Sequence, residues 1–238
     1  MIPVPVYPFL IPWLRPCYDY APLIWLGGLV CLWLTRYTHQ LAQRWGGGYY
    51  LLSALIRPLG VLLIVAGWMA LFASTDLENV ITPEHPAEWK SLFGLADGRP
   101  TIVFWLNVLW LVGEVVSLGF GLWAVAVLGV RRSFFYRRLD DPLITRGPYS
   151  VVRHPQFLSA SGVTFFTVQF YITMSWWDYA RLPYIEWRLS WGEIGIANWV
   201  LFTVALWLLA LLEDRELAAH FGPDYQLYAH RVPRLFPN

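Results

Sequence analysis

The chain has 238 residues, of which 57% are apolar and only 14% are charged, and its formal net charge is +1. This composition excludes an ordinary soluble domain and indicates a membrane protein. No basic tail is present, so a nucleic-acid partner is not expected. The two cysteines and five scattered histidines lack the spacing of metal ligands, and no metal site is expected.

Residues 1–20 are expected to form a proline-rich arm, because repeated prolines forbid a regular helix there. Apolar segments follow, and about five of them approach the ~20 residues that a membrane-spanning helix needs. The predicted spans are 21–34, 49–73, 101–130, 157–177 and 196–212, and the first, which is short, is expected to extend to about residue 37. The sequence therefore predicts an all-α, polytopic membrane protein that forms one membrane domain over residues 1–238.

The segments that join these spans differ in charge. Most arginines fall between the first and second spans, between the third and fourth, and after the fifth, whereas most acidic residues fall before the first span or in the other joining segments. Because arginine and lysine are enriched on the cytoplasmic side, we expect the N-terminus outside and the C-terminus in the cytoplasm.

Two polar stretches flank the last two apolar segments. The first, TRGPYSVVRHPQF, covers residues 145–157, and the second, EDRELAAHFGPDYQLYAHRVPRLFP, covers residues 213–237. Polar groups beside hydrocarbon are costly unless they are paired or used, so we expect one composite site at the cytoplasmic surface. Backbone N–H groups at the helix start near Pro155 could receive an anionic group there.

These stretches resemble the isoprenylcysteine carboxyl methyltransferase family of integral membrane methyltransferases. The first stretch matches the family pattern at Gly147, Pro148, Tyr149, Arg153, His154 and Pro155, with Phe157 in place of a tyrosine. The second matches it at Glu213, Leu217, Phe221, Gly222, Tyr225 and Tyr228, with Asp214 in place of a glutamate. The resemblance covers residues 141–238, whereas residues 21–140 carry no recognised motif.

The resemblance implies that the chain binds S-adenosylmethionine and transfers its methyl group to a lipophilic or lipidated acceptor from the membrane. The implied cofactor-binding residues are Gly147, Pro148, Tyr149, Arg153, His154, Pro155, Glu213, Phe221, Tyr225 and Tyr228. An isoprenylcysteine-like carboxylate is the favoured acceptor, because it is already ionised at neutral pH. A thiol, hydroxyl or amine acceptor would need activation and stays an alternative.

The chain departs from the family at one position that bears on the acceptor. The family usually carries an arginine one helical turn before its acidic pair, where this chain has Leu209. We therefore take Arg231 as a candidate catalytic residue that holds the acceptor carboxylate, with Arg153 as the alternative. Arg234 is expected to contribute little.

Glu114, in the middle of the third apolar segment, is the second candidate catalytic residue. A carboxylate at membrane depth is functional by default, so it is expected to orient a polar group of the acceptor. The alternative is a partner inside the helix bundle, such as Arg57. Asp214 and Glu216 are expected to have structural roles.

A second hypothesis is a non-catalytic membrane subunit that packs against other membrane proteins. The 15 tryptophans, the proline-rich arm and the departures at Phe157, Leu209 and Asp214 motivate it. A third, a sterol-reductase-like enzyme, is disfavoured by the length of the chain. All three place the protein among membrane lipids.

Overall fold

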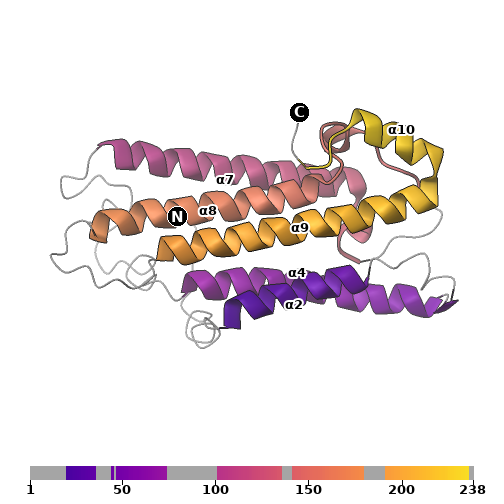
Figure 1. The fold of residues 1–238 in the computed structure, drawn as a ribbon, viewed down its shortest axis with the longest axis horizontal. Coiled ribbons are helices and arrows are strands. Elements are labelled where there is room, and N and C mark those ends of the chain that lie inside the picture. The colour runs from indigo at the N-terminus through magenta and orange to yellow at the C-terminus, as the bar shows by residue number, and fades with distance from the viewer. Residues whose placement is uncertain are drawn as a thin grey trace.

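The computed structural model describes residues 20–35, 44–45, 47–73, 101–135, 141–179 and 191–235. Within these residues all regular structure is helical, and long antiparallel helices form an elongated bundle (Figure 1). They are α2 (Ala21–Leu34), α4 (Gly47–Ala73), α7 (Thr101–Leu128), α8 (Pro155–Tyr179) and α9 (Trp191–Phe221). The proline-rich arm predicted for residues 1–20 lies, except for Tyr20, outside the described residues.

Three short helices gather at one end of the bundle, where both polar stretches also lie (Figure 1). They are η2 (Arg131–Phe135), η3 (Gly147–Ser150) and α10 (Pro223–Arg231). The alternating direction of the long helices explains this gathering. The segments after α2, after α7 and after α9 all emerge at the same end.

Three of the described helices are long and apolar enough to cross a membrane, over Gly48–Ala70, Phe104–Leu128 and Gly195–Phe221, and Ala21–Leu34 is a shorter apolar helix. Only 11% of the residues in the most apolar part of α7 are buried, so most of its valine and leucine side chains face outward. An apolar surface of this kind suits lipid rather than water. The fold is that of a helical membrane protein, and the count of five spans stays a prediction.

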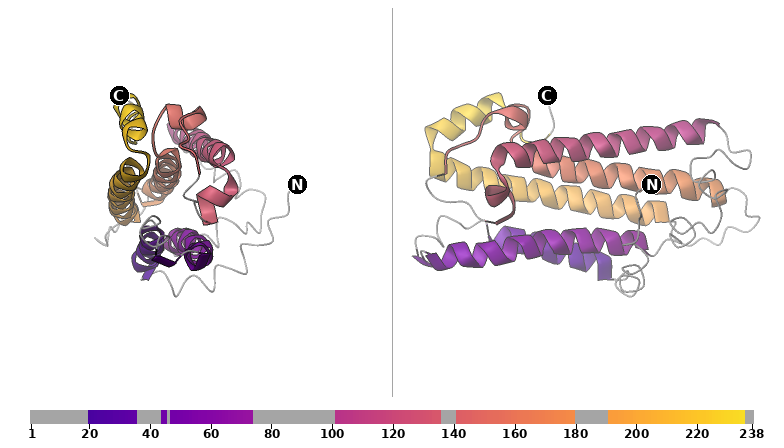
Figure 2. Two further views of the ribbon diagram at one scale, coloured as in Figure 1. Left: turned by 90° about the vertical axis from the view of Figure 1, so that its right-hand side faces the viewer. Right: turned by 180° about the vertical axis from the view of Figure 1, so that it is seen from behind.

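Helices α2 and α4 pack closely because glycine lies at their crossing. A Cβ atom on Gly28 would lie 2.5 Å from the carbonyl oxygen of Gly60, and one on Gly67 would lie 2.7 Å from the backbone nitrogen of Trp25. Small residues that let helix backbones approach are a common basis of helix association in membranes. The pair α2 and α4 therefore forms a rigid unit beside α7, α8 and α9 (Figure 2).

Aromatic side chains join this pair to α9. The ring of Phe202 meets the rings of Trp25 and Trp68 edge to face, with centroid distances of 5.5 and 5.4 Å. The indole of Trp25, which is fully buried, donates a hydrogen bond to the side-chain oxygen of Asn198 over 3.3 Å. The core of the described bundle thus lies between α2, α4, α8 and α9.

Helix α8 lies between α7 and α9 (Figure 2) and is richer in hydroxyl side chains than its neighbours. The serine and threonine hydroxyls of α8 whose side chains the structure describes are satisfied within the bundle. Ser159 donates to the carbonyl of Ser117 on α7 over 2.7 Å, and Ser161 lies 2.8 Å from the hydroxyl of Thr203 on α9. Since hydrocarbon offers no hydrogen bonds, such pairing lets a polar helix occupy the interior of a membrane bundle.

Candidate functional site

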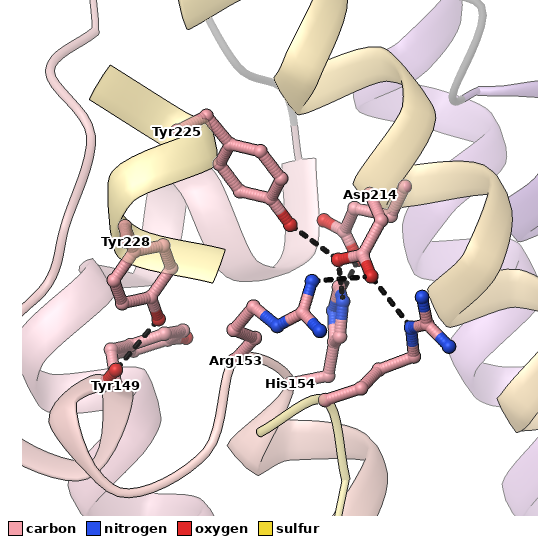
Figure 3. A network of polar contacts seen from close by, with 8 residues as sticks. Tyr149, Arg153, His154, Asp214, Tyr225 and Tyr228 are labelled. Atoms are coloured by element: carbon pink, nitrogen blue, oxygen red, sulfur yellow. Dashed lines mark hydrogen bonds and ion pairs between the residues drawn. The ribbon is translucent and has the colours of Figure 1, made fainter. Parts of the chain in front are cut away.

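The segment before α8 and the segment after α10 pair through their backbones. The N–H group of Arg153 donates to the carbonyl of Pro233 over 2.9 Å, and that of His154 donates to the carbonyl of Arg234 over 3.1 Å. Nearby, the hydroxyl of Tyr228 on α10 donates to the carbonyl of Tyr149 over 2.6 Å (Figure 3). The two polar stretches, far apart in sequence, are thus joined directly.

Asp214, near the cytoplasmic end predicted for α9, is the centre of the polar network in Figure 3. Its Oδ2 atom accepts hydrogen bonds from Nη1 of Arg153 over 2.7 Å and from Nε of Arg234 over 2.6 Å. Its Oδ1 atom lies 2.7 Å from Nε2 of His154 and accepts a hydrogen bond from the hydroxyl of Tyr225. A buried carboxylate with these partners ties α9, α10 and both polar stretches together, which agrees with the structural role expected for it.

His154 lies between Glu213 and Asp214, two adjacent acidic residues of α9. Its Nδ1 atom is 3.2 Å from Oε2 of Glu213, while its other ring nitrogen faces Asp214. A carboxylate only accepts hydrogen bonds, and both ring nitrogens of histidine donate only in the protonated form. The ring also stacks on Phe157, with an angle of 8° between the ring planes. This arrangement favours a charged imidazolium, which leaves no lone pair for general-base chemistry.

The pKa values follow the same geometry. Burial lowers the pKa of His154, but the hydrogen bonds to Asp214 and Glu213 and the negative charges of both outweigh burial and raise it above its ordinary value. Burial and the hydrogen bond to Asp214 raise the pKa of Tyr225, and burial raises that of Tyr228. Both phenols are therefore neutral donors at physiological pH.

The raised pKa predicts how stability depends on pH. Stabilisation by protonated His154 is fully present below its ordinary pKa of 6.5 and is lost as the pH rises through the raised pKa of the folded protein. The thermal unfolding midpoint of the wild type should fall as the pH rises above the ordinary histidine pKa of 6.5, and that of His154→Gln should change less. Tryptophan fluorescence at constant ionic strength measures both midpoints. Parallel curves would show that His154 is not the titrating group.

A cavity of about 130 Å³ lies beside this network. Glu213 lines it together with aromatic residues of both polar stretches. The volume is several times what one water molecule requires. Residues of both motifs, together with residues of α4, α7 and η2, line it: Arg57, Leu128, Arg132, Asp141, Pro142, Leu143, Ile144, Tyr149, Arg153, His154, Pro155, Gln156, Phe157, Glu213, Glu216, Leu217, His220, Phe221, Tyr225 and Tyr228.

Most of the residues expected to bind the cofactor line this cavity. They are Tyr149, Arg153, His154, Pro155, Glu213, Phe221, Tyr225 and Tyr228. Gly147 and Pro148 do not line it and instead shape the turn that precedes it. Gly147 has a φ angle of +62°, which suits glycine, and Pro148 is buried with its carbonyl accepting the N–H groups of Val151 and Val152.

Among the described residues, Arg153 retains an unsatisfied donor. Its Nη1 atom is bound to Asp214, but its buried Nε atom has no hydrogen-bond partner in the part of the chain that the structure describes. An unsatisfied buried donor is costly, and more so when it is charged. A ligand oxygen that reached Arg153 from the cavity would satisfy it.

The structure gives Arg231 and Arg234 places opposite to those expected from the sequence. Arg231, the candidate for holding the acceptor, is exposed at the end of α10 and is not among the residues that line the cavity. Arg234, which was expected to contribute little, binds Asp214. Leu209 is 5% exposed and packs in the core with Phe202 and Leu206, so its side chain faces neither the cavity nor lipid.

Glu114 also lies away from the described lining of the cavity. Its Oε1 atom accepts a hydrogen bond from the hydroxyl of Thr167 on α8 over 3.2 Å, so the carboxyl group has a partner inside the bundle. Arg57, considered as that partner, instead donates to the hydroxyl of Thr35 and to the carbonyl of Arg132, both over 3.2 Å. Arg57 lines the cavity, which its place in the unmatched half of the sequence did not indicate.

Comparison with known proteins adds no assignment, because no family model, no curated protein and no solved structure matches the chain. The resemblance to the carboxyl methyltransferases therefore depends on the two polar stretches alone.

Proposed function

We propose that the protein is a membrane methyltransferase that uses S-adenosylmethionine and acts on a lipophilic acceptor. The observation that carries this proposal is the cavity, because both matched stretches line it although 55 residues separate the end of the first from the start of the second in the sequence. A coincidental match of two short patterns would not require them to share one cavity.

The cavity offers the groups that this cofactor needs. When bound, S-adenosylmethionine supplies an electrophilic methyl group on a sulfonium. Tyr149, Phe157 and Phe221 offer walls for its purine, and the carboxylate of Glu213 offers an acceptor for hydroxyl or ammonium donors. Arg153, with its unsatisfied Nε, offers a donor to the carboxylate of the amino-acid end.

The state of His154 bears on the acceptor. A carboxylate acceptor needs only to be positioned and kept from water, since it is already deprotonated. A thiol, hydroxyl or amine would need a base, and His154, held between two carboxylates, does not offer one. This supports an isoprenylcysteine-like carboxylate over the alternative acceptors.

Binding of S-adenosylhomocysteine tests the proposal. Isothermal titration of the purified protein in lipid nanodiscs should show binding, and Glu213→Gln should weaken it by about 10- to 100-fold, the effect of losing a hydrogen bond to a charged group. Asp224→Asn, an equivalent change at an exposed position of α10, is the matched control and should leave the affinity unchanged. Both variants should first be shown to be folded by size-exclusion chromatography.

Absence of binding to the wild type in lipid would contradict the methyltransferase proposal. If stoichiometric partner chains then copurified with the protein, the non-catalytic subunit would become the better hypothesis. Binding that was equal in the wild type and Glu213→Gln would remove Glu213 from the cofactor site.

A further inference from the structure

The cavity has a second group of charged residues that the matched motifs do not include. Arg57 comes from α4, Arg132 from η2, and Asp141 from the segment before η3. Arg57 and Arg132 belong to the half of the sequence that has no recognised motif. Both nevertheless line the same cavity as Glu213 and Tyr149.

Arg57 is held in place rather than left to extend into solvent. It is 6% exposed, its Nε atom donates to the hydroxyl of Thr35, and its Nη1 atom donates to the backbone carbonyl of Arg132. Thr35 itself is 3% exposed and its hydroxyl donates to the carbonyl of Leu32. The guanidinium is thus oriented by α2 and η2 at the edge of the cavity.

Arg132 forms an ion pair with Asp141, and the adjacent Arg131 pairs with the same carboxylate. Oδ1 of Asp141 lies 3.0 Å from Nη2 of Arg132 and 2.6 Å from Nη2 of Arg131. Of these two arginines, only Arg132 lines the cavity. Of the members of this group that line the cavity, Arg57 and Arg132 are cationic and Asp141 is anionic, so the group has a net positive charge that favours an anion.

We infer that Arg57 and Arg132 bind the anionic group of the acceptor, which places the acceptor's carboxylate on the α4 and η2 side of the cavity and the cofactor on the α9 and α10 side. Guanidinium groups suit this role because their planar donors match a carboxylate. The inference rests on the proposed function and assigns to Arg57 and Arg132 the duty that Arg231 was expected to have.

The position of Arg57 also fits an acceptor that enters from the bilayer. Helix α4 is one of the three described helices that are long and apolar enough to span a membrane. The outward face of α4 carries exposed leucines before and after Arg57 in the sequence: Leu51, Leu52, Leu55, Leu59 and Leu62. A lipid tail could therefore stay in hydrocarbon while its charged end reaches the cavity. An anionic amphiphile is the class of acceptor that meets both conditions.

Two probes that differ only in charge test this inference: radiolabelled 3-(farnesylthio)propionate and its neutral primary amide. Equilibrium binding to the protein in nanodiscs, corrected with empty nanodiscs, should show a preference of the wild type for the carboxylate. Arg57→Gln and Arg132→Gln should each weaken carboxylate binding by about 10- to 100-fold and leave amide binding within about twofold. Arg131→Gln is the matched control, because Arg131 also pairs with Asp141 but does not line the cavity.

The same samples should be titrated with S-adenosylhomocysteine, whose affinity should be unchanged in all three variants. If Arg57→Gln does not fold, Arg57→Lys and Arg132→Gln still decide the outcome, since lysine keeps the charge but not the planar pair of donors. Equal affinity of the wild type for the two probes, or unchanged carboxylate binding in the folded variants, would overturn the inference. If the wild type did not bind S-adenosylhomocysteine, the proposed function itself would be contradicted.

Discussion

Replacing Asp214 by asparagine is expected to destabilise the folded protein strongly, although the two side chains have nearly the same shape. Arg153, Arg234 and His154 would lose the negative charge that they share. Removing one partner from a buried ion pair costs about 3–5 kcal/mol, which is a large fraction of the usual total of about 5–15 kcal/mol. The loss of stability should lie near the lower end of the range of about 3–5 kcal/mol, since the Arg234 side chain is 31% exposed and water screens its charge.

Thermal unfolding of the purified protein in nanodiscs, followed by tryptophan fluorescence, measures this effect. Asp224→Asn removes a carboxylate from an exposed position and should leave the midpoint within experimental error. A normal midpoint for Asp214→Asn would show that Glu213 alone balances the neighbouring cations. The structural role assigned to Asp214 would then be wrong.

Leu209→Arg, which restores the residue that the related family usually carries, is expected to destabilise the protein and not to raise its activity. Leu209 is buried among apolar side chains of α2, α4 and α9, so an arginine there would place an unpaired charge in the core. The penalty for burying an ion is several kcal/mol even after the surrounding structure relaxes. Leu209→Met keeps the volume and should cost less than about 1.5 kcal/mol.

The measurement is the yield of monodisperse protein after extraction, together with methyl transfer to a prenylcysteine carboxylate. A folded Leu209→Arg variant with increased turnover would show that this turn of α9 faces the acceptor. It would also mean that Arg57 and Arg132 are not needed to bind the carboxylate.

The long helices could be predicted from the sequence more reliably than their ends. The first predicted span begins with α2 at Ala21, but its expected extension to about residue 37 goes past the end of α2 at Leu34 and lies mostly outside the described residues. The last predicted span ended at residue 212, whereas α9 continues to Phe221. Apolar length indicates where hydrocarbon ends, but the helix continues through Glu213 and Asp214 because these residues are paired rather than hydrated.

The composition of the site could be predicted only in part. The two motifs predicted one composite site, and Tyr149, Arg153, His154 and Glu213 from these motifs line one cavity. The match gave Glu213 a binding role and left Asp214 structural, and of these two adjacent residues, which point about 100° apart on a helix, Glu213 is the one that lines the cavity. The motifs could not show that the chain turns back after α10, which brings Arg234 rather than Arg231 to Asp214.

The contribution of Arg57 could not be predicted at all from the motifs. An arginine near the start of an apolar segment is ordinarily explained by attraction to lipid phosphate. Its place at the cavity depends on the close packing of α2 against α4, which presents the hydroxyl of Thr35, and on the position of η2. Such long-range contacts leave no local pattern in the sequence.

The order of the charged residues along the chain has a consequence for biosynthesis. Arg153 and His154 precede Asp214 by 61 and 60 residues, so they are already at the membrane when the ribosome completes α9. An acidic residue that enters hydrocarbon alone costs about 2.5–3.5 kcal/mol at the centre of a helix and less near its end. Glu213 and Asp214 are thus synthesised after the cationic residues of the first polar stretch that pair with them, and Tyr225 and Arg234 complete the network only as the last residues are translated.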